Sequence, residues 1–266
     1  MKKWLTGITI LFVLTIIPVS FAQTDENITV ITKSDSMQEI IFDGKWTFPE
    51  EWKISAAEIL KYENNEKFYL RTAHYENFIY VMINFETDIH VDKNSDKATI
   101  CFDSENKKKS KPTESTYCYT VTLGQNQGST FQGGTDLVNK GYMKQIENHD
   151  GFIAIAKPSD ENDRYNKNSH ATYEFRIPID QIGRIDNYGF FVSVFEANSD
   201  KFYTWPKDLR ENVLEFPSPE KWGTLVSPDK TLPEFSQITA LIVGFSSIFV
   251  LIKFSNKFGL NQRMNF

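Results

Sequence analysis

Three aspartates at four-residue spacing are the first candidates for chemistry in this chain. Asp88, Asp92 and Asp96 lie between two strand-like segments, and Asp103 and Glu105 offer an alternative pair. Ca²⁺ prefers carboxylate oxygens that converge with backbone carbonyls, so the first set is a candidate calcium site. Neither set has the dense Asp, Asn and Gly spacing of a strong calcium loop, which leaves solvated surface charge as the other interpretation.

A second candidate site lies late in the chain, in the segment that holds Tyr203, Trp205 and Arg210. A sugar site needs exposed aromatic faces that stack on the ring, flanked by polar groups that bind its hydroxyls. These three residues would supply both from one loop. The alternative is that Trp205 packs against the edge of the domain.

Catalytic signatures are absent from the sequence. It holds no GxSxG, Walker or HExxH motif, and its four histidines show no metal-ligand spacing. Carboxylate pairs occur, but 35 acidic residues supply many by chance. We therefore expect a protein that is not an enzyme. The formal charge of −6 and a single basic run, Lys107 to Lys111, interpreted as a solvated hairpin tip, also argue against nucleic-acid binding.

The N-terminus carries an export signal. Residues 1–22 combine a short basic start, an apolar stretch and a Ser-Phe-Ala end, which predicts a signal peptide cleaved after Ala22. An uncleaved anchor helix is the alternative. Asn27, in an Asn-Ile-Thr sequon close behind the cleavage site, is a candidate glycosylation site.

The C-terminal region carries an apolar segment. Residues 235–254 contain one charge, Lys253, and about 20 helical residues cross a hydrocarbon core of about 30 Å. The sequence therefore predicts a transmembrane helix, with an apolar helix of a soluble core as the alternative. Basic residues follow the segment, so the positive-inside rule places the tail in the cytoplasm and the body outside.

The start of this apolar segment resembles a PEF-type C-terminal sorting signal of archaeal surface proteins. Pro233, Glu234 and Phe235 stand directly before and at its first residue. The resemblance implies processing by an archaeosortase, although Ser236 stands where many such tails have Gly.

The two cysteines, Cys101 and Cys118, lie in the part of the chain that is predicted to be exported, where thiols are normally oxidised. Each falls in a β-patterned stretch, and a polar, Pro-containing connection joins the two stretches. If these stretches pair as a hairpin, the cysteines can lie opposite each other. The sequence therefore predicts one disulfide, worth about 3 kcal/mol.

The body between the two ends reads as a series of short strands rich in aromatic and β-branched residues. Residues 68–75 and 78–85 flank Glu76 and Asn77, which predicts a hairpin. Further strands are expected at 99–103, 117–123, 151–156, 171–177, 190–197 and 223–226. This pattern favours a mainly β fold, a two-sheet antiparallel, jelly-roll-like β-sandwich.

Little of the body has helical periodicity. A turn of helix is expected at residues 179–182 and a weak one near 135–144. The stretch 125–149, rich in Gly, Gln and Asn, is expected to be an excursion over the sandwich.

A series of landmarks runs along the body in a characteristic order. They are Phe42 to Trp46, Glu51 with Trp52, Phe78 to Val81, Cys101 to Asp103, Tyr173 to Pro178, and Pro217 to Gly223. This order resembles that of the family 9 carbohydrate-binding modules and the related DOMON-like β-sandwiches. The landmark tryptophans Trp46, Trp52 and Trp222 are expected in the core.

The resemblance implies sugar binding in some relatives and haem binding in others. Haem-binding relatives use axial Met, His or Lys ligands, for which Met82 and Met143 are candidates here. Met82 filling the core is the alternative, because Phe78 and Tyr80 precede it on the same face of their strand.

Together these features predict the organisation of the chain. It comprises a signal peptide (1–22), an N-terminal segment (23–41), a β-sandwich (42–227), a linker (228–234), a transmembrane helix (235–254) and a cytoplasmic tail (255–266).

We expect a single-pass cell-membrane protein whose outward body binds carbohydrate or glycoconjugate. A haem-binding redox protein and a structural envelope protein without a small ligand are the alternatives. Ca²⁺ is the first candidate cofactor and haem a weaker one. Expected partners are the membrane, glycans or envelope components, and an archaeosortase.

Overall fold

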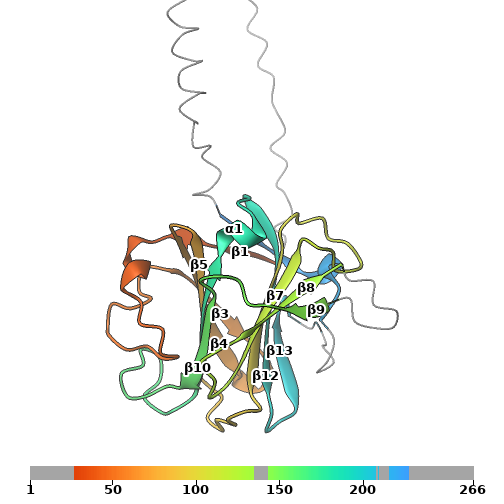
Figure 1. Ribbon diagram of the computed structural model, residues 1–266. Helices are drawn as coiled ribbons and strands as arrows, with labels where there is room; N and C mark the ends of the chain where they lie inside the picture. The colour runs from red at the N-terminus through yellow and green to blue at the C-terminus, as the bar shows by residue number, and fades with distance from the viewer. Residues whose placement is uncertain (1–26, 135–142, 208, 210–215, 228–266) are drawn as a thin grey trace, which may run out of the picture.

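The computed structural model describes residues 27–134, 143–207, 209 and 216–227. These residues form two β-sheets packed face to face, which confirms the predicted mainly β sandwich (Figure 1). The predicted signal peptide, linker, transmembrane helix and tail lie outside the described residues. Within the described ranges no helix has the length and apolar character that crossing a membrane requires.

Within the described residues, the first sheet has eight strands. In spatial order these are β1 (Ile28–Val30), β14 (Gly223–Val226), β12 (Asn187–Glu196), β6 (Lys97–Asp103), β7 (Thr116–Thr122), β8 (Ser129–Gly133) and β9 (Met143–Ile146), with β13 (Lys201–Trp205) also paired to β12. The Cys101 and Cys118 positions are directly opposite in the β6–β7 ladder, and the predicted disulfide joins them.

The second sheet has six strands in the part of the chain that the structure describes. Their order is β10 (Ile153–Pro158), β11 (Ala171–Pro178), β5 (Phe78–Phe85), β4 (Lys67–Tyr75) and β2 (Thr32–Lys33), with β3 (Ala56–Lys61) also paired to β4. The predicted β4–β5 hairpin forms around Glu76 and Asn77, with Tyr75 opposite Phe78. The short helices are η1 (Asp35–Glu39), η2 (Glu63–Asn65), α1 (Ile179–Ile182) and η3 (Pro219–Lys221), and α1 is the helical turn that the sequence predicts.

The expectation of purely antiparallel sheets is wrong at the N-terminal edge. There β1 runs parallel to β14 in the first sheet, and β2 runs parallel to β4 in the second. The chain passes from one sheet to the other at Ile31, whose amide donates to the Val226 carbonyl at 2.9 Å. The sandwich therefore begins at Ile28, ahead of the predicted boundary at Phe42.

Two segments expected to lack strands form them. The stretch 125–149 contributes β8 and β9, and the region expected to be a loop around Tyr203 is β13. β8 and β9 are rich in polar residues and lie at the edge of the first sheet, so backbone pairing rather than an apolar face specifies them. Of the weak helix expected at 135–144, residues 143 and 144 belong to β9 and the rest lie outside the described residues.

Side chains alternate across the second sheet as strand geometry requires. On β5, Ile79, Val81 and Ile83 enter the core between the sheets. Tyr80 and Met82 point to the outer face, where a second layer that includes Trp46 and Trp52 buries them. Met82 thus fills a buried cluster, the alternative to haem ligation.

A buried carboxylate fastens this outer layer to the sheet. Glu174 on β11 accepts hydrogen bonds from Trp52 Nε1 at 2.9 Å and from the backbone amide of Gly44 at 2.7 Å. Burial raises the pKa of Glu174 well above its usual range. The landmark residues 42–52 therefore have a structural role, and Trp46, Trp52 and Trp222 are buried as expected.

Candidate functional site

The late aromatic residues do not form the expected exposed platform. On β13, Tyr203 and Trp205 are 7% and 3% exposed because both point into the core between the sheets. The Tyr203 ring lies edge-on to Phe85 at 4.9 Å, and Trp205 packs against Phe190 at 5.7 Å. Their burial corrects the expectation of two stacking faces, and packing of Trp205, the alternative, is what the structure has. Arg210 lies outside the described residues.

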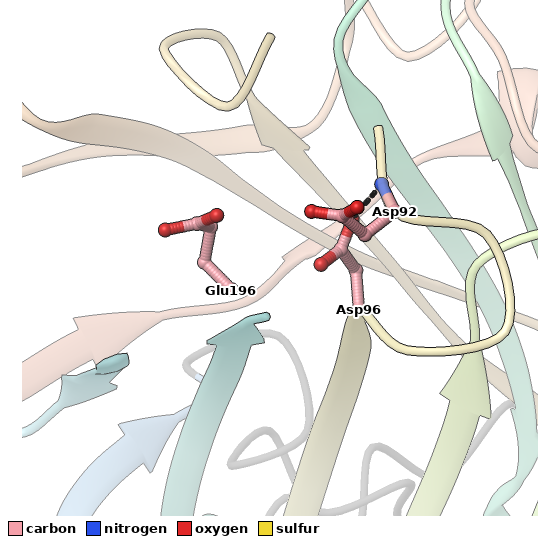
Figure 2. A group of neighbouring side chains, drawn as sticks. All are labelled: Asp92, Asp96 and Glu196. Atoms are coloured by element: carbon pink, nitrogen blue, oxygen red, sulfur yellow. Dashed lines mark hydrogen bonds between the residues drawn. The ribbon is translucent and has the colours of Figure 1, made fainter. Parts of the chain in front are cut away.

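Two of the three candidate calcium ligands, Asp92 and Asp96, come together, and Glu196 joins them. The carboxylate oxygens of Asp92, Asp96 and Glu196 lie within 4.8 Å of one another (Figure 2). Asp88 is close enough for the charges of Asp96 and Glu196 to raise its pKa. We refer to Asp88, Asp92, Asp96 and Glu196 as the acidic cluster.

Strand pairing builds the acidic cluster at one end of the sandwich. Asp88 follows the end of β5, Asp96 immediately precedes β6, and Glu196 is the last residue of β12. β6 and β12 are neighbours in the first sheet, with Lys97 opposite Phe195. The sequence did not single out Glu196 because the register of two strands nearly a hundred residues apart cannot be read from their patterns.

Backbone amides fix two of the carboxylates. Asp96 accepts from the Ala197 amide at 2.9 Å and from the Asp92 amide at 2.6 Å. Glu196 accepts from the Ser199 amide at 3.0 Å. These contacts hold the carboxylates near one another in spite of their mutual repulsion.

Asp88 is the least satisfied member of the acidic cluster. It is 3% exposed, and neither oxygen makes a hydrogen bond of ordinary geometry with a described residue, although the nearby His90 amide acts to lower its pKa. Burial first, and then the charges of Asp96 and Glu196, raise the pKa of Asp88 to about 7. The buried hydroxyl of Tyr173 beside the cluster also has no hydrogen-bond partner among the residues that the structure describes.

Within the part of the chain that the structure describes, no ion pair involves a carboxylate of the acidic cluster. The ion pairs between described side chains involve other carboxylates, such as Asp160 and Glu86. Buried carboxylates of one sign are unfavourable unless they are protonated or hold a cation. The arrangement can therefore bind a hard cation through oxygen ligands.

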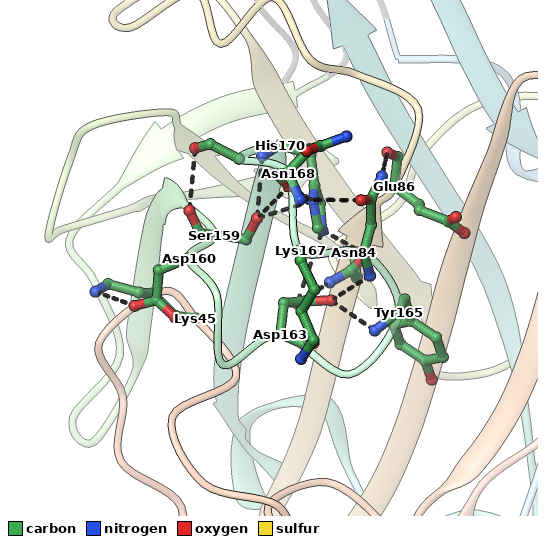
Figure 3. A network of polar contacts seen from close by, with 12 residues as sticks. Lys45, Asn84, Glu86, Ser159, Asp160, Asp163, Tyr165, Lys167, Asn168 and His170 are labelled. Carbon is green, nitrogen blue, oxygen red and sulfur yellow. Dashed lines mark hydrogen bonds and ion pairs between the residues drawn. The ribbon is translucent and has the colours of Figure 1, made fainter.

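A second polar group, around His170, is enclosed within the fold (Figure 3). His170 Nδ1 lies 2.7 Å from the carbonyl oxygen of Asn168 and 2.8 Å from Ser159 Oγ. His170 Nε2 lies 2.9 Å from Asn84 Oδ1, and Asn84 Nδ2 donates to Asp163 at 2.6 Å. We refer to these residues as the His170 network.

Donor and acceptor counting defines the role of the His170 network. The carboxylate of Asp163 accepts only, so the amide nitrogen of Asn84 faces it and the amide oxygen faces His170. Asp163 Oδ2 also lies 3.7 Å from His170 Nε2. Ser159, Asp163 and His170 are all buried, so the set fastens the loop between β10 and β11 rather than acting on a substrate.

An open polar cleft lies at the opposite end of the sandwich from the acidic cluster. Its volume is about 860 Å³, and the β6–β7 loop, β7, β8 and α1 line it. Tyr117 and Gln132 are among its lining residues, and both are half-buried. Asn27, the candidate glycosylation site, is exposed in the turn before β1.

Among the comparisons with known proteins, the one with solved structures gives matches. No protein-family model matches the chain, and no curated protein matches it. A family 9 carbohydrate-binding module from Caldicellulosiruptor kristjanssonii in complex with cellotriose is similar at 13% identity, with 75% of this chain and 93% of that chain covered and a TM-score of 0.51. Such a module in complex with glucose gives 13% identity, 75% and 95% coverage, and a TM-score of 0.46. The likeness to the first establishes a shared β-sandwich fold.

Proposed function

We propose that this protein is a non-catalytic binding protein whose β-sandwich recognises carbohydrate or glycoconjugate. The observation that supports this most directly is the fold it shares, at a TM-score of 0.51 over 93% of the other chain, with a module in complex with cellotriose. The identity of 13% means that the sugar-contacting residues of that module are not transferred. Any site in this chain must be argued from its own residues.

We also propose that the sandwich is held at the outer surface of the cell membrane by the predicted C-terminal helix. Ser227, the last described residue of the sandwich, follows β14 and donates from its amide to the carbonyl of Asp186. Asp186 precedes β12, whereas Glu196 ends it. Ser227 and the acidic cluster therefore lie at opposite ends of the sandwich. If the chain continues from Ser227 into the predicted anchor, the end with the acidic cluster would face away from the membrane.

A glycan array tests the proposed binding function. The purified full-length chain is expected to bind a subset of immobilised glycans, and heat-denatured protein should lose that signal. A folded chain that binds no glycan but co-purifies stoichiometrically with other envelope proteins would favour the structural alternative. A Soret band in its absorption spectrum would instead favour the haem-binding alternative.

The acidic cluster supports a second proposal, a structural Ca²⁺ site. Ca²⁺ takes six to eight oxygen ligands, and Asp92, Asp96 and Glu196 place carboxylate oxygens within 4.8 Å of one another. The unsatisfied, buried oxygens of Asp88 are the observation that favours a bound cation over solvated surface charge. Such an ion would join the loop before β6 to the end of β12 and stabilise this end of the sandwich.

A further inference from the structure

We propose that the glycan is held in the polar cleft between the β6–β7 loop and α1, with Tyr117 and Gln132 as its floor. This inference deepens the proposed function and rests on it. The cleft volume of about 860 Å³ lies within the range of roughly 300–1,000 Å³ that is typical of ligand sites. The ligand class that its chemistry fits is a short neutral oligosaccharide.

The difference between the two sheets leaves this cleft open. β10, the edge strand of the second sheet, packs against β7, but β8 and β9 extend the first sheet further. Tyr117 and Gln132 are opposite each other in the β7–β8 ladder, so they share one face. Tyr119, two residues along β7, enters the core, which identifies this face as the inner one. The floor of the cleft is therefore inner-face surface that no strand of the second sheet covers.

Hydrogen bonds orient the two floor residues. Gln132 Nε2 donates to the Tyr117 hydroxyl at 2.9 Å and to the Glu114 carbonyl at 2.9 Å, which engages both amide hydrogens. Because the Tyr117 oxygen accepts here, its own hydrogen is free to donate. The Gln132 Oε1 atom forms no hydrogen bond with any described residue. The floor thus offers a fixed donor and a fixed acceptor side by side.

This pairing matches the chemistry of a sugar. Each hydroxyl of a pyranose both donates and accepts, so neighbouring hydroxyls can bond to a donor and an acceptor at once. The Tyr117 ring adds an apolar surface, and the His149 ring holds it edge-on at a centroid distance of 5.4 Å. A preorganised floor loses little conformational freedom on binding, which favours affinity.

The charges around the cleft favour a neutral ligand. Its lining includes Glu105, Glu114 and Asp180 with Lys107 and Lys109, so both signs are present. Lys107 pairs with Glu105 at 2.8 Å, which neutralises two of these groups. A strongly anionic or cationic glycan would meet repulsion from one set of side chains.

This inference is tested by calorimetric titration of the full-length chain. The ligands are cellotriose and the neutral oligosaccharide that binds most strongly on the array. Tyr117→Phe removes the donor and keeps the ring, and Gln132→Leu removes the acceptor at similar size. Each should weaken binding of the same oligosaccharide about tenfold or more. Gln127→Leu, in a separate small pocket of about 330 Å³ between β8 and β9, is the matched control and should leave affinity unchanged.

The outcomes separate this inference from the proposed function. If the wild-type chain binds a neutral glycan and Tyr117→Phe binds it equally well, the cleft assignment is overturned while the binding function stands. Binding of charged glycans alone overturns the ligand class. A folded wild-type chain that binds no glycan overturns both. Because Tyr117→Phe keeps the packing of the ring, it remains informative even if Gln132→Leu does not fold.

Discussion

The carboxylate of Asp96 accepts a hydrogen bond at 2.9 Å from the backbone amide of Ala197. This contact joins the residue before β6 to the residue after β12, although about 100 positions separate them in the sequence. It brings Asp96 beside Glu196 and so completes the acidic cluster. This contact between the flanks of two neighbouring strands helps to give the cluster its geometry.

We expect Ca²⁺ to raise the melting temperature of the full-length chain, with a smaller effect of Mg²⁺, because a site of several fixed carboxylates suits the larger and more flexible coordination of Ca²⁺. Glu196→Gln should remove most of this shift, since it removes a ligand charge at nearly constant size. Asp150→Asn, an exposed carboxylate outside the cluster, is the control. Equal shifts for Glu196→Gln and wild type would refute the proposed site.

The stability of the metal-free protein should fall as pH rises from about 4 to about 8. The pKa of Asp88 is raised from 3.8 to about 7 in the folded state, so the fold prefers the protonated carboxyl. The stabilisation that Asp88 gives to the folded state is fully present below the pKa of its unfolded form. It is lost as pH rises through the pKa of the folded form. Urea unfolding in the presence of a chelator measures this dependence.

Asp88→Asn provides the control for that pH dependence. It should flatten the profile between pH 4 and 8 and stabilise the chelated protein at pH 8 by on the order of 2 kcal/mol. Added Ca²⁺ should stabilise the wild type more at pH 8 than at pH 5, because protons and the cation compete for the same oxygens. A pH profile that is identical in the wild type and Asp88→Asn would count against the role of Asp88.

The disulfide should make a measurable contribution to stability. Cys101 and Cys118 are buried and separated by 17 positions, and closing a loop of that length contributes about 3 kcal/mol. The double variant Cys101→Ala with Cys118→Ala should therefore unfold at lower urea concentration. Reduction of the wild type should give a similar loss, and an unchanged midpoint in both cases would contradict this contribution.

The His170 network should contribute more to the free energy of unfolding than the partly exposed ion pair beside it. His170→Ala leaves the buried Asn84 and Asp163 without their partner, which should cost about 2–4 kcal/mol. Lys45→Met breaks the partly exposed Lys45 to Asp160 ion pair of 2.7 Å and should cost less than about 1 kcal/mol. Equal losses in urea unfolding would mean that the network does not fasten its loop as described.

The strongly patterned strands could be predicted from the sequence. Residues 68–75 and 78–85 are rich in aromatic and β-branched residues and flank a turn, and the structure has them as the β4–β5 hairpin. β8 and β9 were missed because their polar residues give no alternating signal. The parallel pairings of β1 and β2 were missed because such short segments carry too few residues to show a period.

Residues close in sequence could be grouped from their spacing, whereas burial and strand register could not be predicted. Asp88, Asp92 and Asp96 were identified from their spacing, but Glu196 depends on the β6–β12 register. Tyr203 and Trp205 have the composition of a sugar platform, yet their alternation on β13 turns both rings into the core. Tyr117 and Gln132 had no distinguishing pattern, because their pairing exists only in the β7–β8 ladder.

The most direct test of the central claim is calorimetric titration of the folded full-length chain with a panel of neutral oligosaccharides that includes cellotriose. A carbohydrate-binding sandwich predicts saturable binding of at least one of them, at one ligand per chain and with an affinity that Tyr117→Phe weakens. The claim is contradicted if none of the neutral oligosaccharides binds saturably to protein whose circular dichroism is that of a folded β-sandwich.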